Sequence, residues 1–275
     1  MDQAEADRQG VVSVIVRTNN DRSVLRETLE AVFSQKMGRA AEYLLVDEGS
    51  SDGTLQVADG FPFNHRILLG RFVSGSHTLN RAMEMAKGEL VIHLLGHTIP
   101  VGTGCFQALL DSFKEDSVAA VYGRQRPHPR GDLFKNIDFE DGYNDIRRES
   151  NIVSHSFVAL RRSVWQEVPY DEGCLSAEDK PWSQEVRRRQ RRFIYEPEAR
   201  VLHYHRFSLG VPFRRAYTRA RTHRQIRLSY RALYFAVPFR VLNDFRKIER
   251  KIWLPMSPIY RGVEAIGYLL GWYFS

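Results

Sequence analysis

The sequence predicts an α/β fold in which a mostly parallel, doubly wound sheet carries helices on both faces. The first observation behind this prediction is the N-terminal segment, where residues 11–17 are apolar and β-branched and end in a polar turn at 18–21. Leu25, Leu29 and Val32 then recur at the spacing of a helix that packs on a sheet. A strand, a polar turn and an amphipathic helix therefore follow one another.

The same order of strand, polar turn and helix recurs further along the chain. Residues 43–46 form an apolar run that ends in an acidic turn, and residues 66–70 precede a helix that starts near Ser76 and ends at Gly88. Residues 89–95 are typical of another buried strand. Strands that alternate with crossover helices indicate a parallel sheet.

The turn after the strand at 43–46 is the most informative segment, because its polar side chains stand at the strand end where open α/β sheets bind ligands. Gly49 and Gly53 permit positive φ and close approach of a ligand. Asp47 and Glu48 are adjacent acids, which would repel bare phosphate. They suit hydroxyl or amide groups, such as a ribose and the edge of a base.

Composition and length limit the organisation of the chain. At 275 residues, with 43% hydrophobic and 12% aromatic side chains, it can form one large domain and an appendage. We place the α/β domain at 1–210 and a basic, aromatic helical extension at 211–275. The two cysteines make no disulfide framework, and residues 1–10 lack the features of a signal peptide. We therefore expect a cytoplasmic protein.

Five segments stand in order along the chain: 14–20, 46–54, Asn80 with 88–89, 177–179, and 195–199 with His203 and His205. Together they resemble the motifs of family 2 glycosyltransferases, and within that family those of the rhamnosyltransferase-like members. They span roughly residues 11–210, and several ordered motifs are more specific than a single Gly-rich loop. The resemblance implies a GT-A fold and an inverting transfer of a sugar from a nucleotide-diphosphate donor to a glycan or a lipid-linked glycan.

The resemblance also implies where the two substrates bind. The expected contacts to the donor nucleotide lie at strand ends or in the helices that follow: Thr18, Asn20, Asp47, Glu48, Ser51 and Asn80. The expected contacts to the acceptor lie in a loop after the strand at 118–121 and in the region that resembles the family's acceptor side: Arg124, Gln125, Asn151 and Trp182. For Trp182, packing in the core is the competing interpretation.

The catalytic carboxylates are expected at Glu178 and Asp179. An acceptor hydroxyl is a weak nucleophile, so a base must take its proton as it attacks the anomeric carbon. The resemblance points to Asp179 as that base. Pro181 can begin a helix, which would place Asp179 at the N-terminal end of that helix. The alternative is that Asp179 only caps this helix.

The segment that should hold a divalent cation, Mn or Mg, departs from the family pattern. The expected Asp-x-Asp motif is absent, because Leu95 and Gly96 stand where carboxylates are expected and His97 takes the place of the last Asp. His203 and His205 lie where related enzymes supply a further ligand. Two interpretations stay open: these histidines hold a cation, or protonated histidine and arginine neutralise the diphosphate directly.

The charge of +7 is concentrated near the C-terminus, where residues 206–251 interleave arginines with aromatic side chains. Such a segment suits nucleic acid or an anionic membrane surface, and the transferase motifs favour the membrane. The apolar end at 260–275 is too short to span a bilayer, which takes about 20 apolar residues, so we expect it to dock on the interface or on a second subunit. A helical hairpin on the catalytic core is the third interpretation.

Two other functions compete with sugar transfer. A nucleotidyltransferase would need a Gly-rich, Lys-containing phosphate loop, which the first strand turn lacks. A catalytically degenerate GT-A protein that binds nucleotide sugar or glycan without transfer would explain the missing acidic motif. The basic run at 187–192 is expected to be a solvated helix end, with Gln190 where related sequences place a helix-ending glycine.

Overall fold

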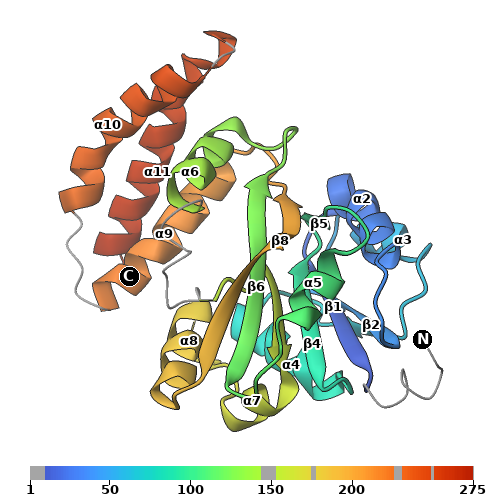
Figure 1. The fold of residues 1–275 in the computed structure, drawn as a ribbon. Coiled ribbons are helices and arrows are strands. Elements are labelled where there is room, and N and C mark those ends of the chain that lie inside the picture. The colour runs from blue at the N-terminus through green and yellow to red at the C-terminus, as the bar shows by residue number, and fades with distance from the viewer. Residues whose placement is uncertain (1–9, 144–152, 175–177, 226–230, 249–250, 275) are drawn as a thin grey trace. The chain divides into compact units, whose positions relative to one another are not determined.

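The computed structural model describes residues 10–143, 153–174, 178–225, 231–248 and 251–274. The described residues pack as two units: those within 10–126 and 143–204 form one, and those within 127–142 and 205–274 form the other. The first unit holds the sheet, and the second is helical (Figure 1). The helical unit thus begins a few residues before the division that we placed at 210, and it takes in a separate segment at 127–142.

The sheet has eight strands in the order β3-β2-β1-β4-β7-β6-β8-β5. Strands β3, β2, β1 and β4 pair in parallel, whereas β4 with β7, β7 with β6, and β5 with β8 pair antiparallel. The strands are β1 (Val12–Thr18), β2 (Ala41–Asp47), β3 (His65–Leu68), β4 (Leu90–Leu95), β5 (Thr98–Pro100), β6 (Val118–Pro127), β7 (Phe157–Arg161) and β8 (Arg192–His203). The predicted α/β class is confirmed, with the parallel part confined to the N-terminal half.

The sheet is doubly wound because alternate side chains of one strand enter different cores. Val14 and Val16 of β1 pack in one core with helices α2, α3 and α5, while Ile15 packs in the other with α4, α7 and α8. These helices are α2 (Arg22–Phe33), α3 (Thr54–Ala58), α4 (Gly75–Met85), α5 (Cys105–Asp111), α7 (Arg162–Glu167) and α8 (Asp179–Arg188). The carboxyl ends of the parallel strands are left for polar turns.

The helical unit consists of α6 (Leu133–Tyr143), α9 (Gly210–Gln225), α10 (Arg231–Lys247), the short 3₁₀ helix η1 (Lys251–Trp253) and α11 (Met256–Tyr273). Helix α11 runs beside both α9 and α10 (Figure 1). Among the described residues, no helix combines the length and the apolar character needed to cross a bilayer.

The ends of β6, β8 and α8 can be compared with what the sequence predicts. Arg124 and Gln125 were expected in a loop, but β6 continues through them to Pro127, which a strand end tolerates. Strand β8 ends at His203, so His205 lies beyond the strand. The expected helix end at Gln190 is confirmed, because its φ of 61° is the left-handed conformation that usually calls for glycine.

Candidate active site

The turns after β1 and β2 interlock at one edge of the sheet. Asp47 accepts hydrogen bonds from the backbone N–H groups of Gly49 and Ser50 and from the Ser50 hydroxyl, which fixes the turn after β2. Asn20 accepts a hydrogen bond from the Ser51 N–H across the two turns. Asn20 and Ser51 are exposed, whereas Asp47 lies beneath them with 2% of its surface exposed. The outer rim of this site is therefore amide and hydroxyl.

A part-buried arginine joins the donor side of the site to the expected catalytic pair. Arg17 Nε lies 2.9 Å from Glu48 Oε1, and Arg17 Nη1 lies 3.2 Å from Glu178 Oε1. Glu48 also accepts a hydrogen bond from the Thr78 hydroxyl of α4. The ends of β1 and β2 and the starts of α4 and α8 are thus linked through Arg17 and Glu48.

The net pKa of Glu178 is lowered, although burial, the largest single influence, raises it. The Arg17 guanidinium acts in the opposite direction, as do His155 and the hydrogen bonds that Glu178 accepts, and together these influences outweigh burial. Glu178 is therefore a carboxylate held by Arg17, and the first turn of α8 presents the next residue, Asp179. A negative charge in a first turn is favoured by the helix dipole.

Two buried histidines lie behind this carboxylate pair. Burial lowers the pKa of His93 well below its ordinary value and also lowers that of His155, on which Asp179 and Glu178 act in the opposite direction. The His155 ring meets Tyr170 and Trp182 edge to face. Burial therefore favours the neutral imidazole of His155, and its ring packs against Trp182 of α8.

Trp182 corrects one expectation. It is 3% exposed, its indole N–H donates to the Val168 carbonyl, and its ring stacks on Phe193. A buried ring with a satisfied N–H has no face left for a sugar. The packing interpretation of Trp182 is the one that fits, and its expected contact with the acceptor is withdrawn.

Asn80 likewise uses its amide inside the protein. The amide nitrogen donates to the Tyr170 carbonyl and to Glu172, and the amide oxygen accepts from the Trp165 indole and the Tyr170 N–H. These four hydrogen bonds occupy both donors and both acceptor positions of the side chain. Asn80 therefore anchors the 165–172 segment to α4, and its amide has no position left for a donor nucleotide.

His97 lies in the turn between β4 and β5, where the acidic motif is missing. Its Nδ1 is 2.9 Å from Asp21 Oδ1, and Asp21 also accepts hydrogen bonds from the Thr18 hydroxyl and the Asn19 N–H. A side chain at Gly96 would begin 2.8 Å from Asp21 Oδ2. The carboxylate beside His97 is therefore supplied from the turn after β1 and fills the space next to Gly96.

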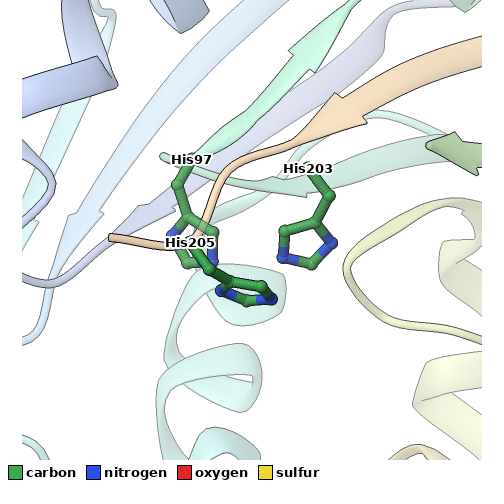
Figure 2. Close-up of side chains that lie close together, drawn as sticks. All are labelled: His97, His203 and His205. Atoms are coloured by element: carbon green, nitrogen blue, oxygen red, sulfur yellow. The ribbon is translucent and has the colours of Figure 1, made fainter. Parts of the chain in front are cut away.

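His203 and His205 complete a cluster with His97. One ligand nitrogen of each of the three rings lies within 4.8 Å of the others, and Figure 2 shows the rings close together. The Tyr204 N–H donates to the His97 carbonyl, so the chain that carries the two later histidines is held against the first. His203 is buried, and the other two are half-buried.

The cluster has the chemistry of a cation site. His97 Nδ1 faces Asp21, and His203 Nδ1 lies 2.9 Å from Gln125 Oε1. Metal-binding histidines commonly donate one ring N–H to such an oxygen, which leaves the other nitrogen for the ion. For His205, Arg215 Nη2 lies 3.4 Å from Nδ1. His97 and His203 therefore fit as a ligand pair, and imidazole favours Mn over Mg.

The other three residues expected to contact the acceptor differ in burial and in hydrogen-bond partners, and one of them is not described by the structure. Gln125 is 5% exposed and bridges Ser154 to His203, so it orients the histidine cluster. Arg124 is half-buried and donates to the Tyr195 hydroxyl. Asn151 lies outside the described residues.

Two site residues, Arg17 and Asp21, were not among the expected ones. Arg17 occupies a strand position where an apolar side chain is usual, and a charge inside a buried strand is a signal that a partner exists. The sequence holds no comparable signal for the partner of Asp21, since His97 is 76 residues away.

Comparison with known proteins establishes the family. The model of the family described as glycosyl transferase family 2 matches residues 13–168, which is more than half of the chain. The chain therefore belongs to glycosyl transferase family 2, and the expected enzyme class, a hexosyltransferase, is confirmed.

Curated relatives are distant. The O-antigen chain rhamnosyltransferase WbaN of Salmonella anatum is 25% identical over 217 residues, which cover 74% of this chain and 69% of the relative. The poly-beta-1,6-N-acetyl-D-glucosamine synthase of Staphylococcus epidermidis is 23% identical over 203 residues, covering 68% of this chain and 48% of that protein.

Solved structures agree on the fold. The mannosyltransferase PcManGT of Pyrobaculum calidifontis, solved with GDP-Man and Mn²⁺, has a TM-score of 0.59 at 19% identity over 96% of this chain and 71% of that one. TarS of S. aureus has a TM-score of 0.58 at 14% identity over 95% of this chain and 54% of that one. The expected GT-A fold is confirmed.

Proposed function

We propose that the chain is an inverting glycosyltransferase in which Asp179 is the general base. The acceptor oxygen attacks the anomeric carbon of a nucleotide-diphosphate sugar, the bond from that carbon to the diphosphate breaks, and the hydroxyl proton passes to the Asp179 carboxylate. The observation that carries this proposal is that the two adjacent carboxylates have different environments. Glu178 is held by Arg17, and Asp179 stands in the first turn of α8.

The donor nucleotide is proposed to bind at the interlocked turns after β1 and β2. Asn20 and Ser51 form the exposed rim, and Thr18, Asp47 and Glu48 shape the turns below it. The Ser50 hydroxyl donates to Asp47 Oδ2, a bond that a ribose hydroxyl or a base N–H can replace. This rim suits the nucleoside part of the donor.

His97 and His203 are proposed to hold a divalent cation next to the diphosphate, with His205 beside them. Such an ion, when bound, stabilises the charge that develops on the departing diphosphate. In this proposal Asp21 and Gln125 fix the orientation of the two rings that bind the ion.

The acceptor is proposed to be a glycan or lipid-linked glycan at the inner face of the cytoplasmic membrane, in polysaccharide biosynthesis. The likeness to an O-antigen chain rhamnosyltransferase supports this class of acceptor and makes a deoxyhexose such as rhamnose the first donor sugar to try. Arg124 is the proposed acceptor contact among the described residues.

The test is the Asp179→Asn variant, which keeps the shape of the side chain and removes the base. We expect transfer to fall roughly a hundredfold or more while affinity for the nucleoside diphosphate in calorimetry stays unchanged. The matched control is Glu185→Gln, an exposed carboxylate on the same helix that should transfer at the parental rate. Parental transfer by Asp179→Asn would refute the base assignment.

The competing function is a degenerate GT-A protein that binds a nucleotide sugar without transfer, and the missing Asp-x-Asp motif is the observation in its favour. A panel of nucleotide sugars, each assayed with Mn²⁺ and with EDTA, separates the two. Binding of a donor without transfer or hydrolysis under any condition supports the degenerate protein.

A further inference from the structure

Helix α10 buries an acid and exposes large apolar side chains, unlike a helix that packs on a water-soluble core. Asp244 is fully buried, whereas Phe239 is 74% exposed and Leu242 and Phe245 are also exposed. The exposed residues are three apart and lie on one face of the helix. A helix on a soluble core shows the reverse, with its apolar stripe inward.

Helix α11 and the 3₁₀ turn before it repeat this arrangement. Arg261 and Glu264 of α11 are buried, while Ile252 of η1 is 83% exposed. We call the exposed apolar side chains of these elements the outer face: Phe239, Leu242, Phe245, Ile252, Ile259, Ile266, Leu270, Tyr273 and Phe274. A face of this many large apolar residues marks an interaction site.

The charges turned inward are fully engaged with one another. Arg261 Nη2 lies 2.7 Å from Asp244 and 2.9 Å from Asp138, and Arg261 Nη1 lies 3.1 Å from Glu264. Arg240 pairs with Asp138 at 2.8 Å and with Glu264 at 3.0 Å. Ionised side chains that face the interior of a helical group and pair there are typical of helices whose outside meets lipid.

The contact between α11 and α9 has the same character. A Cβ added at Gly271 would lie 2.2 Å from the Tyr217 carbonyl oxygen, and one at Gly267 would lie 2.5 Å from that of Phe213. The two glycines are four residues apart, so the helix backbones touch along one stripe. Close approach through small residues is the usual way in which helices pack in lipid, where the hydrophobic effect does not drive them together.

The charge around the outer face selects the partner. Residues 206–275 hold 14 lysines and arginines and three acids, a net charge of +11 against +7 for the whole chain. On the described part of α10, the exposed charged residues are Arg246 and Lys247, and the one acid, Asp244, is buried. A second copy of the chain would bring like charges together across a symmetric interface, whereas anionic headgroups complement them.

We infer that the outer face lies in the headgroup and acyl boundary of an anionic bilayer, with α10 and α11 in the plane of the membrane. No described helix is suited to cross the bilayer, so attachment is to one leaflet. This inference deepens the proposed function, on which it rests for the lipid-linked acceptor. It differs from binding by the arginine-rich segment, because apolar side chains enter the membrane and the arginines only border them.

The test is flotation of the full chain with vesicles of phosphatidylcholine containing phosphatidylglycerol, at low and at high NaCl. We expect Phe239→Ser/Phe245→Ser to lower the vesicle-bound to free ratio about tenfold or more at both salt concentrations, because each ring loses its apolar burial. The matched control is Leu68→Ser/Phe72→Ser, two apolar residues of the sheet unit that are 59% and 51% exposed. This control should bind as the parent does.

Parental vesicle binding by the Phe239→Ser/Phe245→Ser variant would overturn the inference. So would a parental protein that sediments as a dimer, ignores vesicles and becomes a monomer on the same substitutions, since the outer face would then be a protein interface. Donor hydrolysis measured without vesicles keeps this test separate from the proposed function. If the parent binds vesicles but neither transfers nor hydrolyses any donor, the proposed function fails and the docking surface stands.

Discussion

Helices α2 and α10 make opposite use of similar residue types. In α2, Leu25 and Leu29 are fully buried and Arg26 and Glu30 are exposed, as on any helix that covers a sheet in water. In α10 the acid is buried and phenylalanines are exposed. The comparison teaches that a helix's hydrophobic periodicity identifies its two faces, while the surroundings decide which face is outside.

The two units also differ in what holds them together. The sheet unit is held by two apolar cores, one on each face of the sheet. In the helical unit the bulkiest fully buried side chain is Arg261, within a set of ion pairs. Buried ion pairs stabilise little in total but are costly to leave incomplete. The largest expected effect comes from the variant that tests this difference between the units, and smaller effects are expected from variants of the candidate site.

Removing the central cation should affect the helical unit most. Arg261→Met leaves Asp244, which is fully buried, without its cation, and we expect a loss of about 3–5 kcal/mol in unfolding free energy. Denaturant unfolding measures this loss. Arg246→Met, on the exposed side of α10, should change stability by less than about 0.5 kcal/mol. Equal effects of the two variants would remove the contrast between the units.

Asp21→Ala removes the carboxylate that orients His97. If the histidine cluster holds a cation, Mn²⁺ affinity should fall roughly 10- to 100-fold, because ligand orientation is lost. Titration calorimetry with Mn²⁺ gives the affinity, and Asp111→Asn on α5 is the control. An unchanged Mn²⁺ affinity in Asp21→Ala would show that this carboxylate has no part in ion binding.

Asn80→Leu tests whether the amide serves the fold. The change removes the acceptor of the buried Trp165 indole N–H and of the Tyr170 N–H. We therefore expect a loss of about 1–3 kcal/mol in unfolding free energy, with nucleotide affinity unchanged. Arg81→Leu, exposed on the same helix, is the control for stability. A variant that folds as well as the parent and binds nucleotide more weakly would reinstate the donor contact expected from the sequence.

Arg17→Gln should have the smallest effect, and one that depends on pH. In the parent, the lowered pKa of Glu178 contributes stability above its ordinary value of 4.5, and this contribution is lost as pH falls. Without Arg17, burial raises that pKa, so the variant should be less stable by about 1 kcal/mol near pH 7. The gap in melting temperature should narrow between pH 7 and pH 4. A constant gap would show that Glu178 does not titrate with Arg17.

The fold was predictable where a pattern is local. The first strand, expected at 11–17, is observed at Val12–Thr18, and the helix end at Gln190 follows from a position that needs positive φ. The extent of β6 through Arg124 was not predictable, because pairing with neighbouring strands extends it past residues with turn-like composition.

The site was predictable as a set of segments but only in part as a set of contacts. Motif resemblance located the turn at Asp47 and the carboxylate pair at Glu178 and Asp179. It could not reveal that the polar groups of Asn80 and Trp182 form hydrogen bonds inside the core. Their partners there include residues 85 and 14 positions away in the sequence. Sequence also gave no sign of which face of α10 is outward, because periodicity is the same for both.

The contact between Gly96 and Asp21 constrains which side chains this site can carry. A carboxylate introduced at position 96 alone would collide with Asp21, whose Oδ2 is 2.8 Å from the nearest new atom, and would set two negative charges together. The side chains that positions 21 and 96 can carry are therefore coupled: a larger residue at 96 fits only together with a smaller or uncharged residue at 21.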